Sequence, residues 1–206
     1  MTRFAGAQRV PDKRVELYVR KTFLSPEECA GLIALIDAER RPSTITDAYG
    51  ADAAFRTSET ADLPGDHPLV ASVYRRLADY AGLPIAHAER LQGQRYAPGQ
   101  QFKAHTDYFE PTGLDYFEHT GDGGQRTWTM MAYLNEPQAG GATRFVQLNK
   151  LFQPETGKLL AWNNRLPDGG VNGKTLHAGM PVRAGTKYVI TAWFRERARR
   201  FPAVTV

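Results

Sequence analysis

Apolar side chains near the start of the chain recur at the spacing of an amphipathic helix. Cys29, Leu32, Ile33 and Ile36 lie at i, i+3, i+4 and i+7, so a helix would place them on one face. The preceding segment 25–28 has the sequence Ser-Pro-Glu-Glu, in which the serine can cap a helix and the second glutamate completes a capping box. The proline suits the first turn, so we expect a helix that begins at residue 26.

A second amphipathic helix is predicted over residues 68–81. Its apolar face carries Val70, Val73, Leu77 and Ala81, and a glycine and a proline at positions 82 and 84 end it. The segment 40–64 between the two helices is polar and has no clear period, which indicates a long loop or short strands.

From about residue 88 the pattern changes to short runs of β-forming residues separated by glycine, proline and asparagine. The predicted strands cover residues 90–96, 101–105, 127–134, 143–145, 158–162, 174–178 and 188–195. Several short strands at this spacing are typical of a sandwich or a jelly roll. The sequence therefore predicts two helices followed by an all-β body, with the helices bracing one outer face of a sheet.

The composition fits an ordinary water-soluble domain. Of 206 residues, 42% are hydrophobic and 23% are charged, and no stretch approaches the roughly 20 apolar residues that a membrane helix needs. Residues 1–20 contain no apolar run that resembles a signal peptide, and the single cysteine, Cys29, excludes an intrachain disulfide. We therefore expect a cytoplasmic protein without a membrane partner.

The net charge of +4 changes this picture little. Much of the excess positive charge comes from four arginines at positions 195, 197, 199 and 200, which have no aromatic residues between them. Such a cluster is typical of a solvated strand end rather than of a nucleic-acid tail, so no nucleic-acid partner is expected. The sequence leaves open whether the protein is a monomer or a homodimer.

Candidate chemistry centres on three residues that can bind a metal ion. His105 and Asp107 lie two residues apart, so on a strand their side chains would point to the same side. His177, in a later predicted strand, is the best third candidate, and two histidines with one carboxylate form the facial triad of non-haem iron(II) oxygenases. In the alternatives, His105 and Asp107 form a surface pair, or His119 in a loop-like segment is the third ligand.

A lysine next to the last predicted strand suggests the co-substrate. Lys187 lies ten residues after His177, where a cation could pair with the far carboxylate of 2-oxoglutarate. Such a carboxylate needs a partner, because an unpaired buried charge is costly, and a hydroxyl of Tyr96 or Thr143 could share it. The alternative is a strand lysine that faces solvent.

Taken in order, several segments of the chain resemble the prolyl 4-hydroxylase branch of the iron(II)/2-oxoglutarate dioxygenases. The resemblance extends from about residue 15 to about residue 197. The matching segments are 23–29, 56–58, 95–109, 124–129, 133–135, 140–145, 154–157, 177–182 and 185–188, with Trp193. One departure is Ala142, where the family often has an acidic residue before the threonine.

The resemblance implies a fold and a set of cofactors. The fold would be α+β and mainly β, with a double-stranded β-helix (jelly roll) core braced by N-terminal helices. Residues 1–206 would form a single domain, with a helical support region over 15–85 and the jelly-roll core over 86–200. Iron(II), 2-oxoglutarate and dioxygen would take part in the reaction, and ascorbate is a further expected cofactor.

The resemblance also implies residue roles. The metal ligands and catalytic residues would be His105, Asp107 and His177. The residues that bind 2-oxoglutarate would be Lys187, Tyr96 and Thr143. The residues that contact the substrate would be Arg56, Arg126 and Trp193. The alternative for each arginine is a salt bridge at a strand end, and for the tryptophan it is packing in the core.

The expected reaction is hydroxylation of a C–H bond, with a prolyl residue of a peptide or protein as the substrate. The alternatives are the same chemistry on a free amino acid or small metabolite, a non-catalytic jelly-roll binding module, or a metal hydrolase. A wide groove lined by Arg56 and Arg126 would favour a peptide, whereas a closed pocket would favour a small molecule. The glycine-rich segment 109–125 would be a mobile flap or a structural Ω-loop.

Overall fold

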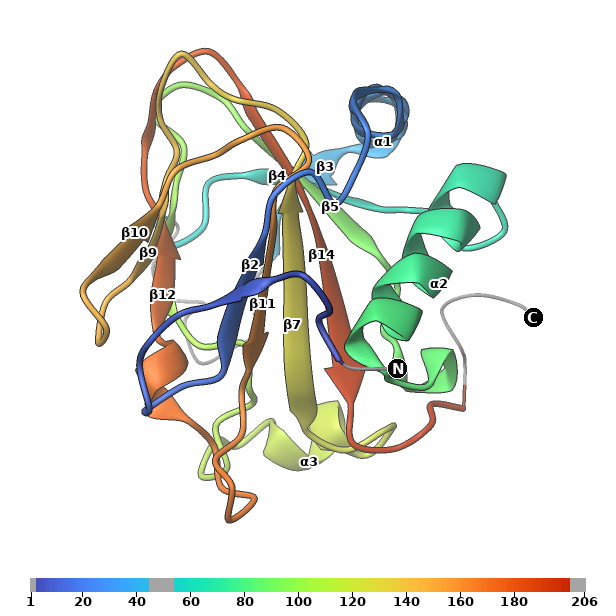
Figure 1. Ribbon diagram of the computed structural model, residues 1–206, viewed down its shortest axis with the longest axis vertical. Helices are drawn as coiled ribbons and strands as arrows, with labels where there is room; N and C mark the ends of the chain where they lie inside the picture. The colour runs from blue at the N-terminus through green and yellow to red at the C-terminus, as the bar shows by residue number, and fades with distance from the viewer. Residues whose placement is uncertain (1–2, 45–53, 201–206) are drawn as a thin grey trace.

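The computed structural model describes residues 3–44 and 54–200, and its strands form antiparallel sheets (Figure 1). Neighbouring strands pair antiparallel throughout the large sheet. Its eight strands are, in order, β1 (Gln8–Arg9), β2 (Leu17–Arg20), β11 (Leu159–Asn163), β7 (Arg126–Tyr133), β14 (Lys187–Arg195), β5 (Gln92–Tyr96), β4 (Glu59–Asp62) and β3 (Arg41–Pro42).

A smaller sheet of four strands packs against the large one. Its order is β10 (Lys150–Phe152), β9 (Thr143–Phe145), β12 (His177–Gly179) and β6 (Phe102–His105), and a third sheet pairs β13 (Val182–Ala184) with β8 (Ala139–Gly140). Phe145 of the small sheet lies in one buried cluster with Met131, Tyr133 and Trp162 of the large sheet. The predicted jelly-roll core, in a mainly β fold of the α+β class, is therefore confirmed.

Strand β7 separates two hydrophobic cores, because successive side chains of a strand point to opposite faces. Met130 and Ala132 belong to the core that contains the buried faces of both long helices. Met131 and Tyr133 belong to the core between the sheets. Neighbouring β14 alternates in the same way, and Val189 faces the inner core. The inner face of this strand pair forms the floor of the candidate site described below.

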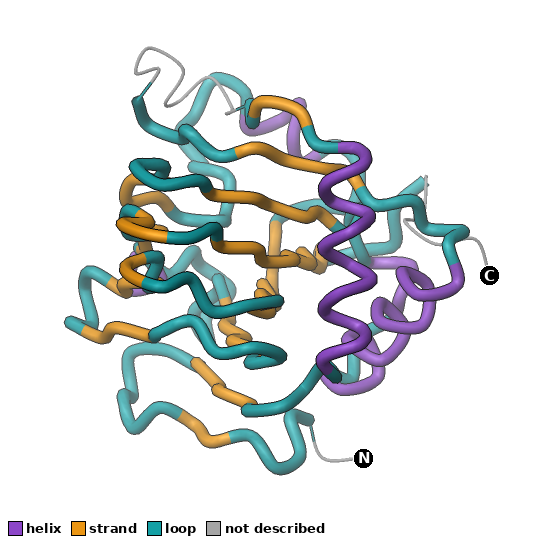
Figure 2. Tube along the Cα trace, turned by 90° about the horizontal axis from the view of Figure 1, so that it is seen from above, coloured by secondary structure: helices purple, strands orange, loops and turns teal. Residues whose placement is uncertain are grey.

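Both predicted helices are present and cover the outer face of the large sheet (Figure 2). Helix α1 (Pro26–Glu39) begins with the predicted capping box, in which the Ser25 hydroxyl accepts from the Glu28 amide and the Glu28 carboxylate accepts from the Ser25 amide. Helix α2 (Pro68–Ala81) has the predicted bounds and ends at Gly82 in a left-handed conformation. Within the described residues, no helix is long and apolar enough to span a membrane.

The region 15–85 contributes strands to the large sheet as well as helices. Strand β2 pairs with β11, and β4 pairs with β5, so both extend the sheet sideways. These strands have only four residues each, which gives too short a pattern for their period to be recognised. Part of the predicted loop, residues 45–53, lies outside the described residues.

The predicted strand over residues 174–178 is wrong in its first half. Residues Gly173–Thr175 form a 3-10 turn, η3, because the Asn172 side chain accepts a hydrogen bond from the Lys174 amide and caps the turn. The strand β12 begins only at His177. Two further short elements are η2 (Ile85–His87) and α3 (Tyr116–Thr120), and α3 lies inside the glycine-rich segment 109–125.

The contact between α1 and β5 yields a test of the packing. A Cβ atom on Gly93 would lie 2.3 Å from Cγ1 of the fully buried Ile36. We expect Gly93→Ala to lower the free energy of unfolding by about 1–3 kcal/mol through overpacking, and Ile36→Ala to lower it by about 2–5 kcal/mol. The double variant should lose less than the sum, because the truncated isoleucine makes room. Additive losses in urea denaturation would contradict this contact.

Candidate active site

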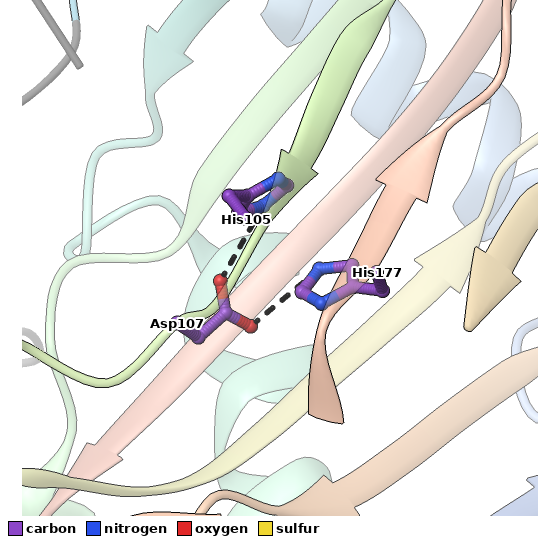
Figure 3. A group of neighbouring side chains, drawn as sticks. All are labelled: His105, Asp107 and His177. Atoms are coloured by element: carbon purple, nitrogen blue, oxygen red, sulfur yellow. Dashed lines mark ion pairs between the residues drawn. The ribbon is translucent and has the colours of Figure 1, made fainter. Parts of the chain in front are cut away.

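Strands β6 and β12 bring two distant histidines together. His105 is the last residue of β6 and His177 is the first residue of β12, and the register of the antiparallel pair sets them opposite each other. Asp107 lies two residues beyond the end of β6, just past the strand predicted over residues 101–105. Figure 3 shows the carboxylate of Asp107 directed toward both imidazole rings.

The three side chains converge closely enough to share one metal ion. Asp107 Oδ1 lies 3.8 Å from His105 Nε2, and Asp107 Oδ2 lies 3.9 Å from His177 Nε2. One potential ligand atom from each residue lies within 4.8 Å of the other two, and all three residues are buried. His119 is not part of this cluster, because its ring bonds Asp115 and stacks on Phe109.

Backbone carbonyls fix the orientation of both imidazoles. His105 Nδ1 donates to the carbonyl of Lys103 at 2.8 Å, and His177 Nδ1 donates to the carbonyl of Thr175 at 2.9 Å. A carbonyl only accepts, so each Nδ1 carries the hydrogen and each Nε2 presents a lone pair toward Asp107. Burial, with the neighbouring His177, lowers the pKa of His105 to about 3, so its ring is neutral as a ligand must be.

The Asp107 carboxylate is ionised despite its burial. Burial raises its pKa, but the neighbouring His177 and His105 outweigh burial, with Arg126 and a hydrogen bond from Thr129 acting in the same direction. The net effect lowers the pKa below the usual value. Two imidazole nitrogens and one carboxylate oxygen thus face a common point, which is the donor set of an iron(II) facial triad.

An inner chamber connects this triad to Lys187. Its wall includes all three triad residues, together with Tyr96, Thr143 and Lys187. The structure thus brings the three residues predicted to bind 2-oxoglutarate into one space beside the candidate metal ligands. Sequence reasoning missed Tyr133, whose hydroxyl donates to Thr143 at 2.7 Å; its inward direction depends on the register of β7.

Lys187 is buried and faces the chamber, so the alternative of a solvent-facing lysine is wrong. The side chain is 2% exposed, and its ammonium lies 4.9 Å from the Tyr96 ring centre and 5.5 Å from that of Tyr133. Among the described residues no carboxylate forms an ion pair with it. Burial lowers its pKa to about 7, so a dicarboxylate would find a cation here that lacks a charged partner.

An outer cleft of about 510 Å³ leads from the surface to the triad. Its lining includes the predicted substrate residues Arg56, Arg126 and Trp193, together with His105 and Asp107. Other lining residues come from segments far apart in the sequence, such as Thr44, Asp62, Asp115, Glu118 and Arg199. The cleft therefore crosses several elements and reaches the candidate metal position from outside.

The two arginines of the cleft differ in their partners. Arg126 forms an ion pair with Glu89 at 2.6 Å, stacks over the Trp193 ring at 4.1 Å and donates to the Asp107 carbonyl. A salt bridge thus holds Arg126 in place at the base of β7. Within the described residues, Arg56 donates only to uncharged oxygens, which belong to Thr44, Ser58, Thr60 and Gln92.

The segment 109–125 borders the cleft and is fastened at its ends. The Gln125 side chain bonds both backbone groups of Phe109, accepting from the amide and donating to the carbonyl, each at 2.8 Å. Between these ends, Leu114 and Phe117 are exposed. Movement of this segment as a flap stays a prediction.

Comparison with known proteins establishes the family. The sequence model of the 2OG-Fe(II) oxygenase superfamily matches residues 91–195. The chain belongs to this superfamily, whose members use iron(II), 2-oxoglutarate and dioxygen, and it is therefore a 2-oxoglutarate-dependent dioxygenase. Within the superfamily it is prolyl 4-hydroxylase-like, as the relatives described next show. The expected role of ascorbate stays a prediction.

The relatives are named as prolyl 4-hydroxylases. The chain is 35% identical over 200 residues to probable prolyl 4-hydroxylase 3 of Arabidopsis thaliana, covering 85% of this chain and 68% of the relative. It is 30% identical to a putative prolyl 4-hydroxylase of Acanthamoeba polyphaga mimivirus, covering 87% and 74%. It spans only 28% of the human prolyl 4-hydroxylase subunit alpha-1, with 34% identity.

Solved structures agree on the fold. The viral collagen prolyl hydroxylase of Paramecium bursaria Chlorella virus-1, solved as a 2-oxoglutarate complex, has 27% identity and a TM-score of 0.67. The match covers 87% of this chain and 95% of that one. A Pseudomonas putida prolyl-4-hydroxylase has the same fold at 21% identity, with a TM-score of 0.57 over 88% and 92% of the two chains.

The buried Lys187 predicts a pH dependence of co-substrate binding. Its pKa is about 7 in the free protein, and pairing with a carboxylate raises it. Above pH 7, 2-oxoglutarate must therefore bind together with a proton, so its Kd should rise up to about tenfold per pH unit. Calorimetry on the iron(II)-loaded protein without oxygen would measure this rise. Pyruvate lacks the far carboxylate and serves as the control; the same pH profile for both ligands would contradict the assignment.

Proposed function

We propose that this protein hydroxylates a prolyl residue within a peptide or protein. The observation that carries the proposal is the outer cleft, which reaches the triad and is lined from several elements rather than closed around a small ligand. A peptide can lie along such a cleft and present one side chain to the triad. The names of the relatives, which are prolyl 4-hydroxylases from a plant and a virus, point to the same substrate class.

In this proposal, His105, Asp107 and His177 hold iron(II), as their donor set and convergence support. When bound, iron(II) would let dioxygen, the oxidant, react with 2-oxoglutarate, which is released as succinate and carbon dioxide, and hydroxylate the C–H bond of the substrate. The two histidines stay oriented through their Nδ1 hydrogen bonds, and Asp107 supplies the negative charge. The protein thereby fixes which side of the site stays open to ligands.

The residues of the inner chamber would hold the co-substrate. Lys187 pairs with the far carboxylate, and the hydroxyls of Tyr96 and Thr143 share it in the proposed arrangement. Both hydroxyl residues are almost fully buried, at 5% and 1% exposed, so the chamber keeps water away from the charge pair. Burial also strengthens the attraction between ammonium and carboxylate.

The cleft residues would contact the substrate in different ways. Arg56 can donate to a substrate carbonyl, because its charge has no carboxylate partner among the described residues. Trp193 lines both the outer cleft and the inner chamber, so its ring can pack against the substrate. Arg126 would act mainly by holding the Trp193 ring and the Asp107 backbone in position.

A free amino acid is the second candidate substrate, and Arg56 is the observation that favours it. The Arg56 guanidinium has no charged partner among the described residues, so it could pair with the carboxylate of an amino acid. The chemistry at the metal would be the same for either substrate. The two candidates differ in the type of group that Arg56 binds, and this difference can be measured.

Turnover over a panel of substrates tests the proposed reaction. With iron(II) and 2-oxoglutarate saturating, proline-containing peptides should stimulate succinate release and gain one oxygen atom by mass spectrometry. His105→Ala and Asp107→Ala should abolish both signals, because the facial triad is broken. His87→Gln, a histidine outside the cleft, is the matched control and should keep them. Succinate release that no proline peptide or free amino acid stimulates would refute the proposal.

Variants of Arg56 distinguish the two substrate classes. If Arg56 bonds a neutral peptide carbonyl, Arg56→Gln should raise KM for the peptide about fivefold to tenfold, equivalent to about 1 kcal/mol. If it pairs with a free carboxylate, the loss should be at least about thirtyfold and Arg56→Lys should restore much of it. Steady-state kinetics on both substrate types measure the difference. An unchanged KM in Arg56→Gln would remove Arg56 from the substrate site.

A further inference from the structure

A buried chain of hydrogen bonds leads away from the back of Asp107. Asp107 Oδ2 accepts a hydrogen bond from Thr129 Oγ1 at 2.7 Å, and Thr129 Oγ1 accepts one from Asn164 Nδ2 at 2.9 Å. Thr129 and Asn164 are both 0% exposed. Neither residue is part of the donor cluster formed by the two histidines and Asp107.

The direction of this chain is fixed by chemistry. An ionised carboxylate only accepts, so the single hydroxyl hydrogen of Thr129 must go to Asp107. The Thr129 oxygen then needs a donor, which the amide of Asn164 supplies. If the Asn164 amide were flipped, its oxygen would face the Thr129 oxygen, and neither atom would have a hydrogen to donate. The chain therefore engages one face of Oδ2 and fixes the rotation of the carboxylate, leaving Oδ1 free of this bond.

The backbone of Asn164 links the same chain to a second member of the triad. The main-chain N–H of Asn164 donates to the Thr127 carbonyl at 2.7 Å, and the main-chain carbonyl of Asn164 accepts from the main-chain N–H of Asn172 at 2.9 Å. Asn172 in turn accepts from the Thr175 hydroxyl at 2.7 Å, and the Thr175 carbonyl accepts from His177 Nδ1. The segment 164–175, which is held by these hydrogen bonds, thus orients both Asp107 and His177.

The remaining atom of the Asn164 side chain indicates that this arrangement serves the site. Asn164 Oδ1 is buried and has no hydrogen-bond partner among residues 3–44 and 54–200. Leaving a buried acceptor unpaired is unfavourable, and an apolar residue of similar size would avoid the cost. The amide is useful at this position because of the hydrogen that it donates to Thr129.

We propose that Thr129 and Asn164 are positioning residues that set the carboxylate rotamer of Asp107 and tie it to the orientation of His177. The proposal rests on the proposed metal site formed by the triad. His105 is oriented separately, through the Lys103 carbonyl on its own strand. Loss of the chain should therefore weaken metal binding without removing any ligand.

Affinity of the metal-free protein for Mn(II), followed by electron paramagnetic resonance, tests the proposal. Thr129→Val keeps the shape and removes the hydroxyl, and it should raise the Kd for Mn(II) about 10-fold to 100-fold. Asn164→Ala should raise it by a smaller factor, because Thr129 can still donate. Thr129→Ser restores the hydroxyl and should return the Kd to within about threefold of the wild type.

Thr127→Val is the matched control. It makes the same change two residues earlier on β7, where the hydroxyl bonds the Phe194 carbonyl instead of a triad residue. We expect its Mn(II) Kd to stay near that of the wild type, while the metal-free Tm of Thr127→Val and Thr129→Val falls by similar amounts.

Three results would overturn the proposal. They are an unchanged Kd in Thr129→Val, an equal rise in Thr127→Val, and a failure of Thr129→Ser to restore binding. If Thr129→Val does not fold, the Mn(II) Kd values of Asn164→Ala and Thr129→Ser test the proposal instead. A Kd in Asn164→Ala equal to that of the wild type would then contradict it. Wild-type protein that binds no Mn(II) would refute the metal site itself, and this inference with it.

Discussion

The antiparallel pairing of β7 with β14 is the constraint on which the rest of the structure depends. Each strand sends alternate side chains to opposite faces, so one face packs against the helices and the other forms the floor of the site. Thr129 and Lys187 both point inward because the register puts them on that face, one beneath Asp107 and the other at the end of the chamber. A slip of one residue would exchange the two faces and remove both groups from the site.

The burial of charged groups is the second constraint. Burying them costs free energy, which a bound metal ion and co-substrate can offset. Lys187 has no charged partner among the described residues, and its depressed pKa shows how unfavourable its charge is in the free protein. Asp107 is stabilised by the histidines, by Arg126 and by Thr129. The free protein thus holds a carboxylate that can bind a cation close to a lysine that can bind a dicarboxylate, and burying these charges lowers its own stability.

Much of this could be predicted from sequence, and the limits have physical reasons. The helices were predicted because capping and apolar period agree over a long stretch, as Ser25 and Ile36 show. His105 and Asp107 could be proposed as ligands because they lie two residues apart at the end of a predicted strand, where β6 does end. Thr129 and Asn164 could not be found, because a single threonine and a single asparagine have no pattern until the strands pair. The assignment of the residues to iron, co-substrate and substrate stays a proposal.

The central claim is that one metal ion and one dicarboxylate occupy adjoining positions between the triad and Lys187. A crystal structure of the protein with Mn(II) and the inert analogue N-oxalylglycine tests it most directly. The account predicts one anomalous-scattering peak within bonding distance of His105 Nε2, His177 Nε2 and Asp107. It also predicts the far carboxylate of the analogue against the Lys187 ammonium. A metal peak elsewhere, or an analogue carboxylate that leaves Lys187 unpaired, would contradict the account.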